Sequence, residues 1–346
     1  DGPHGLLEQQ ISEIIAGVLG RSQFGVTEDF FAAGGNSLAA LSVIAKIEEN
    51  LGKTLSIGAL FANPTVKGLA AVLNEDSPDI EFAPVLPLRE VDSTDSATSK
   101  NTVPLFILPP AGGLGWCYAA YLPYLPGHPS VYALQHEAFT NPNAGYAQSL
   151  RELAEGYLAR IRETLEERQL PSQFSLMGWS VGGTAAVEVA ALAETAGYDV
   201  QQVTLLDAYP AEQWQGIPEP DEQESFRALL RMGGLPEVSA QTVLDLPQTL
   251  ERLRDAGSAM GYLPEDKLGV CLESMRASAA LMRGSNHLNF GGKVVLIGVN
   301  HDDQPYLDAH GWEPHAGSFR TVTLKNGTHP DLVNPERIPE ITAEAF

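Results

Sequence analysis

The sequence has little cysteine and a deficit of positive charge. It contains two cysteines, Cys117 and Cys271, in 346 residues. Two cysteines exclude a disulfide framework and fit a reducing cytoplasm. Lys and Arg number 21 against 44 Asp and Glu, so the formal net charge is -23. Because nucleic acids and anionic membranes are bound by basic surfaces, we expect a cytoplasmic protein with neither kind of partner.

The sequence also lacks a long uninterrupted hydrophobic run. Residues 101–136 contain no Asp, Glu, Lys or Arg. Prolines and glycines divide this stretch before 18 apolar residues can follow one another, so we expect a buried strand, loop and helix there. No signal peptide is present and the first residue is not Met. We therefore expect a piece of a longer polypeptide, with enough apolar material for two domains.

The first 75 residues have the pattern of short helices. Apolar residues recur at helical spacing over 4–19 and 37–51, a short turn is expected around 56–61, and a last small helix over 65–73. Four helices in so short a segment predict a small all-α bundle. Residues 76–103 are rich in Ser, Thr, Asp and Pro. That composition predicts a linker, flexible at least in its second half.

Beyond the predicted linker, strand-like segments alternate with helical patterns at 144–168 and 182–196. This alternation predicts an α/β domain over 104–346, with a parallel sheet covered on both faces. A long insertion at about 210–290 interrupts it, and such insertions are most often lids. The strands are expected at 104–108, 131–134, 174–179, 203–206, 293–299 and 319–324.

One serine has the surroundings of a nucleophile. Residues 178–182, GWSVG, match the pattern G-x-S-x-G, with an apolar strand before Ser180 and a helical pattern after it. This is the setting of a nucleophile elbow, in which a sharp turn strains the serine and glycines avoid collisions with the neighbouring strand and helix. The pattern predicts that Ser180 is a catalytic nucleophile. The alternative is a glycine-rich turn with a serine cap.

A nucleophilic serine needs a base and an acid. His329 is the best-placed base, because it follows the last strand-like segment and gives the order Ser, acid, His of α/β-hydrolases. The acid stays open at this point: Asp207 ends one strand, and Asp302 and Asp303 end the next. The histidines without the placement of His329 are interpreted as surface or packing residues: His128, His136, His287, His301, His310 and His315.

An acyl-transfer site also needs two backbone donors for the oxyanion. The first expected donor is the N–H of Val181, directly after the nucleophile. The second is the N–H of Ala111, the first one available after two prolines in the loop ILPPAGGLG. A plain glycine-rich turn is the alternative for this loop. No metal is expected in the site.

A second serine stands in DFFAAGGNSLAAL, residues 29–41. Ser37 follows two glycines and an asparagine at the start of a helical pattern, and no histidine or acid lies in the local helix register to activate it. A chemical role therefore requires modification by another enzyme. The N-terminus of a helix favours a phosphodiester, and an unmodified helix cap is the alternative.

The two serines together resemble a known arrangement. DFFAAGGNSL is similar to the phosphopantetheine attachment motif of peptidyl carrier proteins. The remainder resembles the type I thioesterase that ends nonribosomal peptide synthetases, and the resemblance covers nearly the whole chain. It implies a four-helix carrier domain over 1–75, a linker over 76–103 and an α/β-hydrolase thioesterase over 104–346. The thioesterase segments occur in the order APVLPLRE, PPAGG, GWSVGG, LLDAYP and GTHPDL.

The resemblance also assigns roles to residues. It implies that Ser37 carries covalent 4'-phosphopantetheine, that Ser180 is the nucleophile and that His329 is the base. It favours Asp207 as the acid. The chain departs from the family at Pro109, where a histidine often stands; this affects the positioning of the oxyanion loop rather than a backbone donor.

The activity implied by the resemblance is the release of a carrier-bound peptidyl or acyl thioester, by hydrolysis or by cyclisation. The implied partners are condensation and adenylation domains upstream in the same polypeptide, and a phosphopantetheinyl transferase that uses coenzyme A. Two alternatives remain: a free-standing esterase on diffusible substrates, and a carrier scaffold whose hydrolase is inactive.

Overall fold

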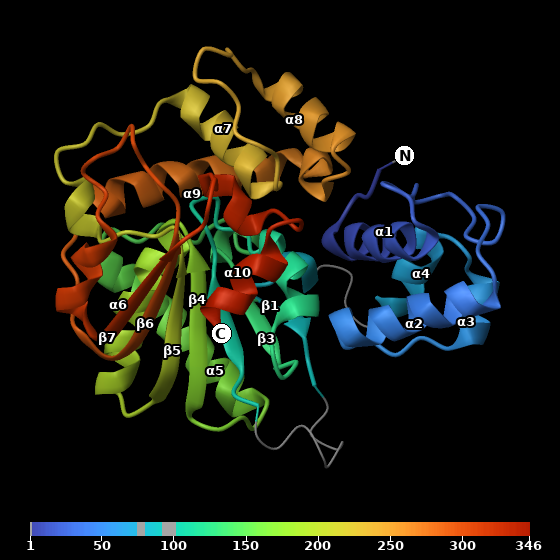
Figure 1. Ribbon diagram of the computed structural model, residues 1–346, viewed down its shortest axis with the longest axis horizontal. Helices are drawn as coiled ribbons and strands as arrows, with labels where there is room; N and C mark the ends of the chain where they lie inside the picture. The colour runs from blue at the N-terminus through green and yellow to red at the C-terminus, as the bar shows by residue number, and fades with distance from the viewer. Residues whose placement is uncertain (1, 75–79, 92–101) are drawn as a thin grey trace.

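The computed structural model describes residues 2–74, 80–91 and 102–346. An N-terminal group of helices lies beside a larger α/β domain (Figure 1). Within the described ranges, no helix combines the length and the apolar character needed to cross a membrane.

The N-terminal group contains the four expected helices and has its own hydrophobic core. Two helices end at glycines with positive φ, Gly20 (φ 67°) and Gly52 (φ 63°), a conformation that glycine adopts without a steric penalty. The turn expected around 56–61 is a short helix. The helices are α1 (Leu6–Leu19), α2 (Ser37–Leu51), α3 (Ile57–Ala62) and α4 (Val66–Leu73).

The α/β domain is built on a seven-stranded sheet of order β1-β3-β2-β4-β5-β6-β7. All neighbouring strands are parallel except β1, which pairs antiparallel with β3 at one edge. The predicted α/β-hydrolase architecture is therefore confirmed. The strands are β1 (Val85–Arg89), β2 (Leu105–Leu108), β3 (Val131–Leu134), β4 (Gln173–Trp179), β5 (Asp199–Leu206), β6 (Phe290–Gly298) and β7 (Ala316–Thr323).

Strand β1 lies inside the segment predicted to be a linker, 76–103. Leu86 and Leu88 are buried in the core of the α/β domain, so this half of the segment belongs to the sheet. Pro87 obscured the strand in the sequence, because proline is tolerated in a sheet mainly at an edge. The second half of the predicted linker, residues 92–101, lies outside the described residues.

Helices cover both faces of the sheet (Figure 1). On one face, α5 (Leu150–Glu167) and α6 (Val181–Thr195) pack against alternate residues of the strands. On the other face lie the 3₁₀ segment η3 (Trp116–Tyr124) and α10 (Ile338–Ala345). Helix α5 begins at residue 150 rather than 144, because Ser149 caps it.

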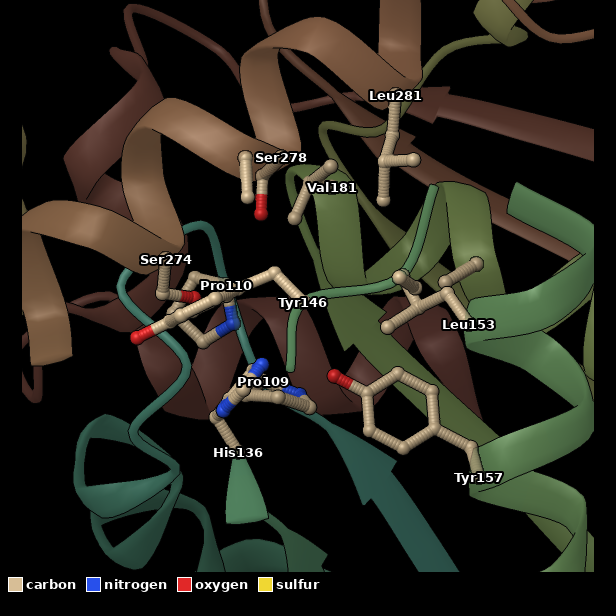
Figure 2. A pocket seen from close by; sticks show the side chains of 13 residues that line it. Pro109, Pro110, His136, Tyr146, Leu153, Tyr157, Val181, Ser274, Ser278 and Leu281 are labelled. Carbon is tan, nitrogen blue, oxygen red and sulfur yellow. The ribbon is translucent and has the colours of Figure 1, made fainter. Parts of the chain in front are cut away.

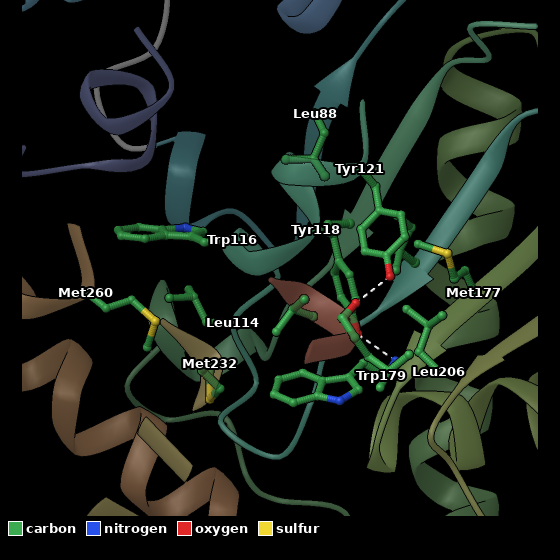
Figure 3. Packing of buried hydrophobic residues seen from close by; sticks show 14 of the residues in the cluster. Leu88, Leu114, Trp116, Tyr118, Tyr121, Met177, Trp179, Leu206, Met232 and Met260 are labelled. Atoms are coloured by element: carbon green, nitrogen blue, oxygen red, sulfur yellow. Dashed lines mark hydrogen bonds between the residues drawn. The ribbon is translucent and has the colours of Figure 1, made fainter. Parts of the chain in front are cut away.

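The insertion at 210–290 forms a helical lid. Its helices α7 (Glu222–Met232), α8 (Leu246–Asp255) and α9 (Glu265–Arg283) lie above the ends of the parallel strands (Figure 1). Met232 and Met260 of the lid belong to the same buried cluster as Trp179 at the end of β4 (Figure 3). The lid therefore packs directly over the strand ends, where parallel α/β sheets bind their ligands.

The N-terminal helices contact the α/β domain at several points. Leu6 joins the buried cluster of that domain. The Gln9 side chain accepts a hydrogen bond from the backbone N–H of Ala259 in the lid, at 2.8 Å. Near the other end of the contact, Arg89 of β1 donates to the carbonyl of Glu49 in the last turn of α2, at 3.4 Å.

Candidate active site

Ser180 occupies the turn between β4 and α6. Its backbone has φ 56° and ψ -131°, a region that residues other than glycine rarely adopt. Its N–H donates to the carbonyl of Leu206 at the end of β5, at 2.9 Å, which helps to hold the strained turn. Strain of this kind costs about 1–3 kcal/mol and persists where the surrounding structure enforces it. Ser180 therefore has the geometry of a nucleophile elbow.

The glycines around Ser180 are required by close backbone contacts. A Cβ on Gly182 would lie 2.4 Å from the carbonyl oxygen of Leu108 and 2.6 Å from that of Pro109. A Cβ on Gly178 would lie 2.3 Å from the carbonyl carbon of Gly182. The start of α6 therefore lies directly against the loop after β2, which holds the second expected oxyanion donor.

We expect Gly182→Ala to lower the free energy of unfolding by about 3 kcal/mol, because the added methyl group collides with backbone that cannot rotate away. Thermal or urea unfolding followed by circular dichroism measures the change. The matched control is Gly156→Ala in α5, where an added Cβ meets open space. That variant should gain about 0.5–1 kcal/mol, because alanine is the better helix former. Equal stability of the two variants would contradict the argument.

The structure joins His329 to Asp207. His329 begins the 3₁₀ segment η8 (His329–Val333), and its Nδ1 lies 2.5 Å from Asp207 Oδ2. Asp207 follows β5, has φ 44° and is 2% exposed. Asp302 and Asp303 are exposed, and within the described residues neither forms a hydrogen bond with His329. Of the three candidate acids at the strand ends, Asp207 is the one that contacts His329.

Asp207 accepts further hydrogen bonds at the same time. The Tyr209 hydroxyl donates to Oδ1 at 2.9 Å and the Val299 N–H at 3.2 Å. His301 Nε2 lies 3.0 Å from each carboxylate oxygen. Burial alone would raise the pKa of the Asp207 carboxyl, but the hydrogen bonds and charges of His301 and His329 outweigh it and hold the pKa well below its ordinary value.

His301 was interpreted from the sequence as a surface or packing residue, and the structure instead places it on the acid. Its side chain is 15% exposed and contacts Asp207 from the loop after β6. The sequence contained one indication, since His301 directly precedes Asp302 and Asp303 at the strand end that was considered for the acid.

Trp179, the residue before Ser180, contacts His329 directly. The Trp179 indole Nε1 donates to the backbone carbonyl of His329 at 3.1 Å, and the two rings lie 5.0 Å apart. Tyr118 supports this strand end: its hydroxyl accepts from the Trp179 N–H at 2.9 Å (Figure 3). The same hydroxyl donates to the Leu108 carbonyl at 2.6 Å. Within the described residues no hydrogen bond joins the Ser180 hydroxyl to His329; in unliganded enzymes such bonds are often long and tighten only with substrate.

The two expected oxyanion donors lie where the start of α6 packs against the loop after β2. Val181 is the first residue of α6, so its N–H has no acceptor within the helix. Ala111 follows Pro110 in the loop that touches Gly182, and in the described part of the chain its N–H makes no hydrogen bond. Both N–H groups are therefore available to an oxygen that develops charge beside Ser180.

The lid holds the oxyanion loop. The hydroxyls of Ser274 and Ser278, one turn apart on α9, donate to the Ala111 carbonyl at 2.8 and 3.4 Å. Because this carbonyl belongs to the peptide after the expected donor, the lid helix limits rotation of the loop backbone. A movement of α9 would therefore disturb the second expected oxyanion donor.

A small cleft adjoins the oxyanion loop, the start of α6 and the lid (Figure 2). It contains about 370 Å³ of empty space, including open solvent. Among the described residues, no charged side chain lines it apart from any charge on His136. Burial lowers the pKa of His136, which favours the neutral ring. Figure 2 shows the Tyr157 hydroxyl pointing into the space beside Pro109. The cleft therefore offers apolar surface and uncharged hydrogen-bonding groups close to Val181.

Ser37 lies exposed at the start of α2 in the N-terminal domain. The helix cap is Asn36, whose side chain accepts from the Ala39 N–H at 2.9 Å, so the serine hydroxyl is not needed as a cap. Gly34 has φ 103° and a Cβ there would meet nothing within 4 Å. An exposed hydroxyl at a helix N-terminus beside open space fits a phosphodiester-linked arm.

The strained serine after β4, the buried acid–histidine pair and the seven-stranded sheet define a serine hydrolase of the α/β-hydrolase class. Residues 103–346 match the family profile of the thioesterase domain, and the chain belongs to that family. Residues 9–73 match the profile of the phosphopantetheine attachment site. The resemblance inferred from the sequence is confirmed, and the N-terminal domain is a site of covalent phosphopantetheine attachment.

The chain is similar to parts of much longer proteins. It is 30% identical over 344 residues to the dimodular nonribosomal peptide synthase of Bacillus subtilis (strain 168), covering 98% of this chain and 14% of that protein. It is 28% identical over 343 residues to enterobactin synthase component F of Escherichia coli (strain K12), covering 96% and 24%. The chain thus spans less than a quarter of the length of these two relatives.

A solved structure shares the fold of the whole chain. A holo four-domain nonribosomal peptide synthetase bound to AMP and glycine matches it with a TM-score of 0.65 and 20% sequence identity. The match covers 99% of this chain and 26% of that one. The fold of this chain, a helical domain followed by an α/β domain, therefore also occurs as part of a larger solved chain.

Proposed function

We propose that this chain ends a biosynthetic assembly line by releasing an acyl or peptidyl group from a carrier-bound thioester. One observation supports this most directly: an exposed serine in a phosphopantetheine attachment domain, a strained serine in an elbow turn and an Asp207–His329 pair occur in one chain. We assign the carrier to residues 1–75 and the thioesterase to 104–346. When attached to Ser37, the phosphopantetheine arm supplies the thiol that holds the acyl group.

In the proposed mechanism, His329 accepts the proton of the Ser180 hydroxyl as its oxygen attacks the thioester carbonyl. The N–H groups of Ala111 and Val181 stabilise the oxyanion. Asp207 holds the Nδ1 proton of His329 and stabilises the imidazolium that forms. His329 then returns the proton to the departing thiolate, which leaves the acyl group as an ester on Ser180.

The second half of the reaction decides the product. Water, or an amine or hydroxyl of the acyl chain itself, attacks the ester on Ser180 with His329 again as the base. Hydrolysis and cyclisation use the same three side chains. They differ in whether the lid excludes water and folds the chain back towards the ester.

The carrier has to change its position to deliver the acyl group. In the structure the C-terminal end of α2 contacts the thioesterase through Glu49 and Arg89, whereas Ser37 begins the helix. A helix of 15 residues is about 22 Å long at 1.5 Å per residue, so Ser37 lies at the far end from this contact. We propose that the carrier rotates away from this contact before Ser180 is acylated.

The proposed partners follow from the relatives and from the attachment site. Condensation and adenylation domains upstream would build the acyl chain, and a phosphopantetheinyl transferase would modify Ser37 with coenzyme A. The location proposed for this assembly is the cytoplasm, where both cysteines, free in the structure, would stay reduced.

The experiment that tests the function loads Ser37 with synthetic acyl-pantetheine from acyl-coenzyme A and a phosphopantetheinyl transferase. Mass spectrometry should show the added mass on the Ser37 peptide, followed by a free or cyclised acid in solution. The control variant Ser37→Ala should gain no mass and should still hydrolyse a small diffusible thioester.

The remaining outcomes decide between the alternatives. A wild-type Ser37 peptide without added mass would favour a free-standing esterase. Failure of a fluorophosphonate probe to label Ser180 in folded protein would favour an inactive carrier scaffold. Either result would overturn the proposed release reaction.

A further inference from the structure

Two histidines contact the carboxylate of Asp207. His329 approaches Oδ2 from η8, and His301 Nε2 lies 3.0 Å from both Oδ1 and Oδ2 from the loop after β6. The reaction proposed above uses His329 and leaves His301 without a role. A side chain that only fills space would not need to place a ring nitrogen within hydrogen-bond distance of both oxygens of this carboxylate.

The position of His301 follows from the sheet. Strands β5 and β6 are parallel neighbours, with Leu206 opposite Ile297, so their carboxyl ends lie at the same edge of the sheet. Asp207 follows β5 directly, and the chain after β6 turns so that the Val299 N–H and the His301 ring both face its carboxylate. The strand end that carries the acid in many α/β-hydrolases here supplies a donor to the acid of the preceding strand.

Two carboxylates, a tyrosine and a histidine surround His301. Asp207 faces it from the end of β5, and Asp303 acts on it from its own loop. The Tyr209 ring packs edge-on against the imidazole, with ring centres 5.4 Å apart, and its hydroxyl is bound to Asp207. His329 reaches the same carboxylate from η8. Burial would lower the pKa of His301, but the hydrogen bond and charge of Asp207 outweigh it and raise the pKa.

We propose that His301 is a positioning residue for the Asp207–His329 pair, holding the carboxylate in place and, when protonated, drawing part of its negative charge away from His329. The proposal deepens the proposed function and rests on it for the effect on rate. The hydrogen bond fixes the carboxylate plane, so that Oδ2 stays aligned with Nδ1 of His329. The positive charge acts separately, because it opposes a second positive charge on His329.

Two variants separate the hydrogen bond from the charge. His301→Gln keeps a neutral N–H donor at about the reach of Nε2, whereas His301→Phe keeps the ring shape and has no donor. We expect kcat for a diffusible thioester to fall about 10-fold in the Phe variant with KM unchanged, and to stay within about 3-fold in the Gln variant.

The pH profile reports the charge. The acidic limb of kcat/KM follows protonation of the base in the free enzyme. Loss of a nearby positive charge makes a proton on His329 more favourable, so the acidic limb should move to higher pH by about 0.5–1 unit in both variants. A merely structural role for His301 would lower activity at every pH without moving this limb.

The controls are His310→Gln and His310→Phe, which change an exposed histidine paired with Glu313. Neither should change kcat or the acidic limb. Thermal unfolding measures whether the His301 variants are folded. If the Phe variant is unfolded, the position of the acidic limb of kcat/KM in the Gln variant tests the proposal. An unmoved acidic limb in the folded variants would overturn the proposal.

A second readout does not need turnover. In ¹H–¹⁵N spectra of imidazole-labelled protein, the Nδ1 proton of His329 should shift when His301 is titrated, and this shift should vanish in both variants. If the wild type does not cleave thioesters, the release function fails while this spectrum still tests the coupling. A His329 signal that ignores His301 would contradict the inference even in an active enzyme.

Discussion

Replacing Ser180 by alanine should lower the rate of acyl release by about 10⁴- to 10⁶-fold, because the covalent route through the elbow is lost. The residual rate would come from the oxyanion donors and from binding. The elbow conformation, with φ 56° at residue 180, should survive the change at little cost, since the surrounding backbone contacts stay in place. The loss is therefore expected in kcat rather than in folding.

The measurement follows the acyl group on Ser37 over time. In the Ser180→Ala variant the loaded carrier should persist, and a fluorophosphonate probe should not label residue 180. The control Ser239→Ala changes an exposed serine in the lid and should leave release unchanged. Release at the wild-type rate in the Ser180→Ala variant would exclude an ester on Ser180.

Replacing Asp207 by asparagine should lower kcat by about 10⁴-fold at neutral pH. The amide is neutral and does not stabilise an imidazolium on His329. If its NH₂ group faces Nδ1 of His329, it donates a hydrogen bond there, so Nδ1 has to be without its proton. The tautomer of His329 that presents a free Nε2 to Ser180 is then disfavoured. Four donors also converge on the carboxylate. The NH₂ group of an asparagine accepts no hydrogen bond, so at least one of these donors would lose its acceptor.

The matched control is Asp302→Asn at the end of the next strand. Asp302 is exposed, and we expect kcat to stay within about 2-fold of the wild type. Steady-state kinetics on a diffusible thioester compare the two variants without carrier loading. A large loss in Asp302→Asn with little loss in Asp207→Asn would return the acid to the β6 strand end.

The choice of acid shows where local sequence information stops. Asp207 and Asp302 both follow apolar strands whose ends lie at one edge of the sheet, so spacing alone admitted either residue. The choice required the path of the chain after β6, which turns the aspartates outward and His301 inward. That path depends on long-range packing, and no local pattern encodes it.

By itself, the sequence determined most of the elements and singled out the two serines. These features depend on residues that are close together in the chain, so their patterns are visible without a structure. They are the helical period, the glycines of the elbow, and Gly34, Gly35 and Asn36 before Ser37. Only the tertiary structure decided the edge strand β1, the hydrogen bonds from Ser274 and Ser278 on the lid to the oxyanion loop, and the second histidine on Asp207. Each of these is a contact between segments far apart in sequence, and its free energy depends on which surfaces folding brings together.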